Sequence, residues 1–460
     1  MGKVMKSSIF RGKTRKKPPL FGIILVPAKM LLNNLLGGFF MFNSTTDVYR
    51  AKRETVHFAK GLVSAKNKVE AKFVTQSIYG IVRSGSIILK KIATALDEPI
   101  QIKNTIDRLS QHLNRPLSKN IQLNYMQKMV NALGEQPVIL VDDSDVIKPY
   151  GEKFESLGRV RDGSSKENKI EKGYHVTEMV GLTAHNKQPV SLFSRIHSSH
   201  EKGYKSTNTI LFEGLKQVIK ALGKKATFIF DRGYDMNALF HFMYEYNQDF
   251  IIRITENRKL FWKGKWFKSA TLRDSRKGKI KTTLTFREGG KVKKETVYVS
   301  HLNIKITASK KPVTLVLVYG LGITPMMLAT NKHMSCKEDV IGLVRDYMSR
   351  WRVEEYFRFK KQHFGFENFR VRSLVSIQNL NQLLTYAIGL IGLLANKQKT
   401  SSLTHRLIRN AKALRSDIQF YYYQLAEGIV ATLAYAREGI QRWFCIRRND
   451  PRQLEIKLAV

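Results

Sequence analysis

The sequence predicts an α/β protein with helical parts at both ends and a basic, β-rich insertion. Three observations predict it. Apolar strands alternate with amphipathic helices between about 136 and 257, helical periodicity dominates on either side, and residues 258–311 carry 17 Lys/Arg against 3 Asp/Glu. Because 43% of the 460 residues are hydrophobic, the chain can bury a sizeable core and general disorder is excluded.

The charge balance points to a polyanionic partner. There are 79 Lys+Arg and 37 Asp+Glu, so the formal net charge is 79 − 37 = +42. Such a surplus favours nucleic acid as the partner, although a merely basic or ribosome-associated protein is the alternative. The two cysteines, Cys336 and Cys445, have neither disulfide-framework nor zinc-site spacing, which favours a reducing compartment such as the cytoplasm.

The first segment is both basic and apolar. Residues 1–60 hold 12 Lys/Arg and 2 Asp/Glu, and residues 20–42 are mostly apolar. Pro27 and Lys29 interrupt this stretch, whereas a membrane-spanning helix needs about 20 mostly apolar residues. We therefore expect no membrane role, and instead either a buried helical hairpin or an over-extended translation start ahead of Met41.

Short helices are expected from about residue 47 to 117. Helical spacing is broken at Ser84-Gly85-Ser86, which suggests a tight turn between two helices. With Arg83, Lys90 and Lys91 exposed, this stretch suits a helix-turn-helix-like DNA-binding unit. An ordinary small helical bundle is an equally good interpretation.

Two predicted strands each deliver an acid at their end. PVILVDDSD places Asp142 after an apolar run, and ATFIFDRGYD places Asp231 in the same way. Acids at strand ends lie where an α/β sheet opens to ligands. Converging carboxylates can hold two Mg²⁺ ions about 3.5–4 Å apart for phosphoryl transfer. A lone acid of this kind is more often a turn or cap residue.

A third acid, Glu354, lies in one long predicted helix from about 336 to 364. Tyr347, Arg350, Glu354 and Lys361 follow offsets of 0, 3, 7 and 14, which at about 100° per residue places them on one narrow face. A carboxylate there could bind metal while the two bases hold phosphates. The alternative is a solvated face with ion pairs.

Other signals are weaker. The stretch from Lys279 to Leu302 predicts a β-hairpin with its turn at Gly289-Gly290, and the last hundred residues are mostly helical. His197 and His200 lie in a Ser-rich stretch and are expected in a solvated loop. The sequence has no Walker lysine motif and no GxSxG, so ATP use and serine hydrolysis are unsupported.

The Tyr-x2-Arg-x3-Glu-x6-Lys spacing resembles the signature of bacterial insertion-sequence transposases with a DDE active site. VDDSD and FDRGYD are similar to that family's blocks for the first two acids, and LATN to the strand before its signature helix. The resemblance covers roughly residues 135–375. It implies a ribonuclease-H-like core, Asp142, Asp231 and Glu354 as catalytic metal ligands, and two Mg²⁺ or Mn²⁺ ions.

The same resemblance implies cutting and joining of DNA ends by a homodimer or larger assembly on the element's terminal inverted repeats. Tyr347, Arg350 and Lys361 would contact DNA phosphates. Some members use a hairpin intermediate and stack a flipped base on a Trp of the insertion, which makes Trp262 and Trp266 candidates, although a core Trp is the more ordinary role.

Neighbouring acids leave alternatives open. Asp145 is the second candidate for the first acid, and Asp143 is expected as a solvated neighbour or cap on the opposite face of the strand. Asp235 is expected to start the next helix, which leaves Asp231 as the ligand.

The expected domains are an N-terminal segment 1–46, a helical DNA-binding domain 47–130, a catalytic core 131–257 and 312–375, a basic insertion 258–311 and a helical C-terminal region 376–460. The predicted function is a DNA transposase acting at the nucleoid in the cytoplasm. The rivals are a catalytically inactive, transposase-derived DNA-binding protein and a structure-specific nuclease with the same core.

Overall fold

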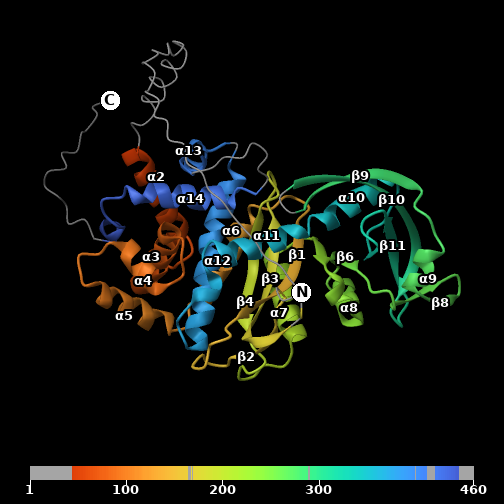
Figure 1. Cartoon of the computed structure of the whole chain (residues 1–460), viewed down its shortest axis with the longest axis horizontal. Helices are drawn as coiled ribbons and strands as arrows, with labels where there is room; N and C mark the ends of the chain where they lie inside the picture. The colour runs from red at the N-terminus through yellow and green to blue at the C-terminus, as the bar shows by residue number, and fades with distance from the viewer. Residues whose placement is uncertain are drawn as a thin grey trace, which may run out of the picture. The chain divides into compact units, whose positions relative to one another are not determined.

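The computed structural model describes residues 44–163, 167, 169–288, 291–398, 400–411 and 420–444 (Figure 1). The expected N-terminal segment 1–46, with its apolar stretch 20–42, therefore lies almost wholly outside the described residues. Within the described ranges, no helix combines the length and the apolar character needed to cross a membrane.

Five helices come first in the described part, and the second of them is central. Its residues from Phe73 to Val82 are all buried, and it ends at Gly85, whose φ of 59° is the left-handed conformation that glycine adopts freely. The C-terminal part of this helix is therefore packed in the core, whereas its first residues, Lys68 and Val69, are exposed. The five helices are α2 (Ser44–Lys60), α3 (Lys68–Ser84), α4 (Leu89–Leu96), α5 (Ile102–Leu113) and α6 (Lys119–Val130).

The three basic residues expected on this helical unit differ in exposure. Arg83 is half-buried rather than exposed, because its guanidinium donates to Ala95 O at 2.7 Å and so holds α3 to the end of α4. Lys90 and Lys91 of α4 are exposed as expected.

One twelve-stranded sheet runs through the rest of the described chain. Its order is β2-β3-β1-β5-β6-β12-β11-β10-β7-β8, with β4 beside β3 and β9 beside β10. The pairs β1–β5 and β5–β6 are parallel, and the other pairs are antiparallel. The fold is therefore mixed α/β, as expected. The strands are β1 (Val138–Ile147), β2 (Gly158–Arg161), β3 (Ile170–Leu182), β4 (Pro189–His197), β5 (Thr227–Phe230), β6 (Asp249–Arg253), β7 (Lys259–Trp262), β8 (Lys265–Lys268), β9 (Ile280–Glu288), β10 (Lys291–Ile306), β11 (Lys311–Tyr319) and β12 (Met326–Thr330).

The central strands form where the sequence has continuous apolar runs. Residues 139–141 of β1 and all of β5 are buried, as expected for strands covered on both faces. Between the strands lie α7 (Thr207–Leu222), η1 (Arg232–Tyr234), α8 (Asn237–Glu245) and α9 (Ser269–Asp274).

The basic insertion is mostly β structure. Its long hairpin β9–β10 flanks the predicted turn at 289–290, which itself lies outside the described residues. The insertion does not form a separate sheet. β10 pairs with β11, and β11 pairs with β12, so hydrogen bonding continues without interruption into the central strands. Figure 1 shows β9, β10 and β11 side by side, with α9 and β8 next to them.

The C-terminal part of the described chain is helical. α12 contacts both the strand β4 and the helix α3, so it links the sheet to the N-terminal helices. Its 23 residues are largely buried. These helices are α10 (Lys337–Met348), α11 (Trp351–Gln362), α12 (Leu374–Asn396), α13 (Ser402–Asn410) and α14 (Tyr422–Ala434), with short turns η2 (Phe366–Asn368) and η3 (Gln441–Trp443).

A buried ion pair fixes α11 on the sheet. Lys360 Nζ lies 3.1 Å from Glu178 Oε2 of β3, and neither side chain is exposed. Ser194 Oγ of β4 accepts a hydrogen bond from Lys360 and donates one to Glu178. Asn381 of α12 donates to the same hydroxyl. Elements that are distant in sequence therefore meet at one polar cluster.

Candidate active site

Asp142 and Asp231 lie side by side. Val141 of β1 is paired in register with Phe230 of β5, and each acid follows directly on one of these two residues. Both acids line a cavity of about 330 Å³. Asp142 does not end its strand, because β1 continues to Ile147 along β3. It marks the point where β1 extends past its parallel neighbour.

Glu354 joins this pair through an arginine. Arg350 donates from Nη1 to Asp142 Oδ2 at 3.1 Å and from Nη2 to Glu354 Oε1 at 2.6 Å. The side chain of Arg350 is 19% exposed, whereas that of Glu354 is 51% exposed. The guanidinium therefore lies between the first and third predicted acids.

The prediction of one continuous helix across this region is wrong. The chain turns at Ser349 and Arg350, so α10 ends at Met348 and α11 begins at Trp351. At the junction, Arg350 N donates to Tyr347 O and Val353 N to Arg350 O, which is the tighter i to i+3 pattern. The spacing of 100° per residue therefore fails between Tyr347 and the residues of α11.

Because of this break, the residues of the Tyr-x2-Arg-x3-Glu-x6-Lys signature have different neighbours. Tyr347 is buried, with 5% exposure, and Arg253 hydrogen-bonds to it. Lys361, near the end of α11, lies 3.1 Å from Glu367 Oε1 and 3.6 Å from Asp145 Oδ2. The structure therefore brings Arg350 to the acid pair, whereas Lys361 pairs with different carboxylates.

The acid pair concentrates negative charge. Burial raises the pKa of Asp142 to about 7, and the charges of Asp143 and Asp231 add to this, although Arg350 opposes it. For Arg350, burial disfavours the charge, but Asp142 and Asp231 outweigh it and raise its pKa. The carboxylates and the guanidinium of Arg350 therefore form one electrostatically coupled cluster.

Asp143 is exposed, as expected for a solvated neighbour, and in addition both of its carboxylate oxygens accept hydrogen bonds. Thr177 Oγ1 donates to Oδ1 at 2.6 Å, and Tyr234 OH donates to Oδ2 at 2.8 Å. Asp145, the second candidate for the first acid, does not line the cavity of Asp142 and Asp231. It forms an ion pair with Lys361 instead. The geometry therefore favours Asp142 over Asp145.

The donor set suits a hard divalent cation, although it is not assembled as a metal site. No group of three or more His, Cys, Asp or Glu side chains in the described part of the chain is arranged to hold a metal. The reason is visible in the geometry, since the guanidinium of Arg350 separates Asp142 from Glu354. Carboxylate oxygens are the ligands that Mg²⁺ prefers, and Asp142 and Asp231 present them to one cavity.

The two tryptophans of the insertion differ in access. Trp262 is half-buried, with Lys263 Nζ 4.7 Å and the guanidinium carbon of Arg276 5.3 Å from its ring centroid. Trp266 is 44% exposed and lines a second cavity of about 610 Å³ with Arg258 and Thr307. Of the two rings, that of Trp266 is therefore the more accessible to a ligand.

A contact missed by the sequence reasoning joins the acid-bearing turn to the insertion. Asp235 does not start α8, whose N-cap is Met236. Its carboxylate accepts from Thr255 Oγ1 at 2.8 Å and from Arg258 Nε at 2.7 Å. The side chain of Asp235 is 1% exposed. No local sequence pattern signals these contacts, because the partners lie about 20 residues apart in different elements.

Comparison with known proteins identifies the family of this region. Residues 206–390 match the family model described as transposase DDE domain. This part of the chain is therefore a DDE transposase domain. The match includes Asp231 and Glu354 and begins after Asp142.

Two solved structures are similar at low identity. One is the cryo-EM structure of a piggyBac transposase synaptic complex with hairpin DNA, with a TM-score of 0.43 and 12% identity over 83% of this chain and 75% of that chain. The other is the crystal structure of the NurA nuclease from Sulfolobus solfataricus, with a TM-score of 0.23 and 11% identity over 54% of this chain and 83% of that chain. No curated protein is significantly similar to the chain.

Proposed function

We propose that the chain is a DNA transposase of a bacterial insertion sequence, which cuts the ends of its element and joins them to target DNA. The observation that carries the proposal is the meeting of Asp142 and Asp231 in one cavity, with Glu354 joined to Asp142 by Arg350. Two of these three acids lie inside the DDE transposase domain.

The topology around the acids supports a ribonuclease-H-like core. The strands β4, β3 and β1 form an antiparallel set, and β5 and β6 add parallel to β1 in the order β4-β3-β1-β5-β6. We propose that residues 131–257 and 312–375 form this core, and that 258–311 is an insertion into it. Helices within 47–130 would bind the element ends, and the helical region 376–460 would support assembly of a homodimer.

We assign Asp142, Asp231 and Glu354 as ligands of Mg²⁺ or Mn²⁺, with two ions per site. Such ions, when bound, activate the attacking water or hydroxyl and stabilise the leaving oxygen. The chain's own groups do the rest. Arg350 holds the negative charge of Asp142 and Glu354 in one place, and the hydrogen bond from Tyr234 keeps Asp143 turned to the same cavity.

Phosphate contacts are proposed for Arg350 and Lys361. Both are cations beside carboxylates at or near the acid cavity, and a phosphate can replace a carboxylate as partner because both are oxyanions that accept charged hydrogen bonds. Tyr347 is buried, so its proposed role is support of the site beside Asp231. Trp266 is the proposed stacking residue for an unpaired base, because its ring is accessible.

The test is cleavage of a DNA fragment that carries the gene with its natural flanks. Purified protein is incubated with the fragment and Mg²⁺, or with chelator, and every new 3′ end is mapped. We expect metal-dependent cuts at paired inverted repeats that are lost in Asp231→Ala, while DNA binding is retained. Scattered cuts would favour the nuclease, and tight binding without cuts would favour an inactive DNA-binding descendant.

A further inference from the structure

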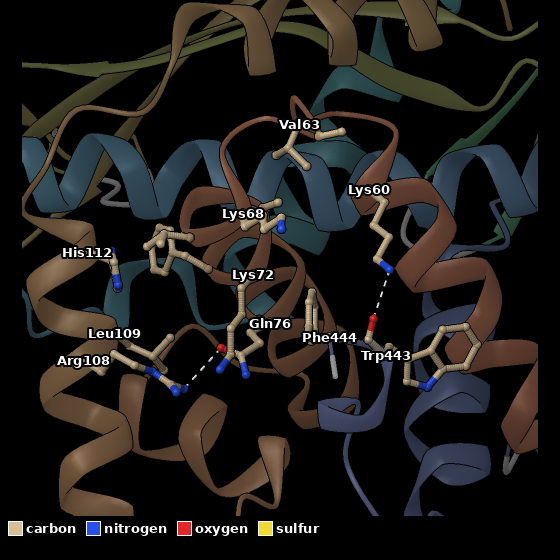
Figure 2. A pocket seen from close by; sticks show the side chains of 14 residues that line it. Lys60, Val63, Lys68, Lys72, Gln76, Arg108, Leu109, His112, Trp443 and Phe444 are labelled. Carbon is tan, nitrogen blue, oxygen red and sulfur yellow. Dashed lines mark hydrogen bonds between the residues drawn. The ribbon is translucent and has the colours of Figure 1, made fainter. Parts of the chain in front are cut away.

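Another cavity belongs to the helical part of the molecule, and its lining comes from α2, α3, α5, the α2–α3 loop and the end of η3 with the residue after it. Its volume is about 670 Å³, within the range of small-molecule sites. Figure 2 shows Lys68, Lys72 and Gln76 of α3 between His112 on one side and Phe444 and Trp443 on the other. The cavity is therefore assembled from parts of the chain that are far apart in sequence.

The lining combines cations with aromatic and aliphatic surface. Fourteen residues line the cavity, and none of these described residues is an acid. Arg108 is committed to Glu98 at 2.7 Å, and Lys60 donates to Trp443 O at 3.1 Å. Lys72 is half-buried and Lys68 is exposed, and among the described contacts neither forms an ion pair. The cavity is thus poised to receive negative charge.

Flat rings are available inside the cavity. His112, which is half-buried, is stacked on the buried ring of Phe73 with centroids 5.2 Å apart, and both rings line the cavity. Burial and the nearby charges of Arg115 and Arg108 lower the pKa of His112, which keeps the ring neutral. Phe444 is half-buried and has Lys60 Nζ 5.5 Å from its centroid. A planar aromatic group with an attached anion matches this lining.

Charge argues against the chain's own ends as the occupant. Residues 1–43 contain eight Lys/Arg and no Asp/Glu, and residues 445–460 contain four Lys/Arg and two Asp/Glu, so their net charges are +8 and +2. Neither segment therefore carries the net negative charge that the cationic lining suits. An anion from outside the chain is therefore the better match.

We propose that this cavity holds one unpaired nucleotide of a bound DNA strand, with the base against His112 and Phe444 and its phosphate on Lys68 and Lys72. The inference rests on the proposed action on DNA, and it adds a second base-binding site besides the insertion tryptophan. A paired base is stacked inside the duplex and cannot place its face on these rings, so the site distinguishes distorted or frayed DNA from regular duplex. Stacking of a base on an aromatic side chain provides the discrimination.

The probe is a short DNA duplex with a single bulged 2-aminopurine, compared with the same duplex in which 2-aminopurine is paired. Binding is measured by anisotropy of an end label, and stacking by quenching of 2-aminopurine fluorescence. We expect the wild-type protein to bind the bulged duplex about tenfold more tightly and to quench its fluorescence. Equal affinity for the two duplexes would overturn the proposal.

Variants of the cavity lining test which residues cause the preference for the bulged duplex and the fluorescence quenching. His112→Ala and Phe444→Ala should reduce the preference from about tenfold to about twofold and abolish the quenching, and the Lys68→Gln/Lys72→Gln pair should reduce affinity for the bulged duplex by several fold. The matched control is Lys216→Gln/Lys220→Gln, which removes two exposed lysines of α7 outside the cavity and should keep the preference. Unchanged thermal melting shows that each variant is folded.

Two further outcomes would overturn the proposal, and a third separates it from the transposase function. A preference that survives the ring variants but disappears in Trp266→Ala would place the unpaired base at the insertion and overturn the assignment. Free dAMP that displaces the probe at a lower concentration than unlabelled DNA does, with both counted as nucleotides, would assign the cavity to a free nucleotide. That result would also overturn the proposal. End cleavage is measured on the same preparations, so loss of cleavage with retained bulge preference would refute the transposase function alone.

Discussion

Replacing Lys360 by Met removes the cation that pairs with the buried carboxylate of Glu178. The methionine has nearly the same length, so packing around α11 is largely retained. Glu178 would then keep its hydrogen bond from Ser194 but lose the ammonium 3.1 Å away. Its second oxygen, Oε1, already has no hydrogen-bond partner among the described residues.

The magnitude follows from this geometry. At 3.1 Å and an effective dielectric constant of about 20, the attraction between the two charges is about 5 kcal/mol. Breaking one partner of a buried pair typically costs about 3–5 kcal/mol, because the other charge remains buried without compensation. We expect Lys360→Met to lower the free energy of unfolding by about that amount. The Glu178→Leu/Lys360→Met double variant should recover at least about 2 kcal/mol relative to the sum of the single variants.

The assay is urea unfolding followed by intrinsic fluorescence for the wild type, both single variants and the double variant. A matched control is Lys361→Met, which changes the neighbouring lysine, whose side chain is 24% exposed. Lys361→Met should lower the free energy of unfolding by less than about 1 kcal/mol. Single variants that each lose under about 1 kcal/mol, or a double variant that loses the sum of the two, would refute the argument from burial.

Three other predictions concern charge. Lys361→Ala should slow end cleavage roughly 10- to 100-fold in single-turnover kinetics, because a charged hydrogen bond to phosphate is lost, and its melting temperature should change little. Unchanged kinetics would show that Lys361 does not contact the DNA. DNA affinity should fall linearly with salt on a log–log plot, and a flat plot would exclude phosphate contacts as its source. Burial lowers the pKa of His197 to about 3, below the unfolded value of about 6.5, so the folded state resists its protonation. The stability that the neutral ring provides above about pH 6.5 is therefore lost as the pH falls towards 3, by about 1.4 kcal/mol per pH unit. The melting temperature of His197→Gln should depend less on pH between about pH 7.5 and 5 than that of the wild type. The same pH dependence in both proteins would contradict the lowered pKa of His197.

Local patterns were enough to predict the sheet and the neighbouring acids. Apolar runs such as VILV and FIF form the buried strands. The acids that follow these runs, Asp142 and Asp231, lie next to each other because β1 and β5 pair in register. The basic hairpin was also predictable, since alternation and the Gly-Gly pair are local signals.

Long-range contacts could not be predicted in this way. The helix break at Ser349 and Arg350 has no Pro or Gly to mark it, and helical periodicity does not record a change of axis. His197 was expected in a solvated loop, but it is fully buried in β4 and hydrogen-bonds to Thr177, because β3 covers the end of its strand. The bridging position of Arg350 likewise depends on β1, which is about 200 residues away in sequence.

Because the sheet is continuous, the insertion cannot be removed from the molecule as a unit. β10 pairs with β11 from Tyr298↔Tyr319 to Ile306↔Lys311, so deleting the insertion would leave that length of β11 with open backbone donors and acceptors. An apolar strand of this kind, buried through residues 313–318, would recruit the same strand of another copy and aggregate. The basic hairpin therefore also covers this edge of β11, and a shortened variant needs a replacement strand or charged residues along that edge.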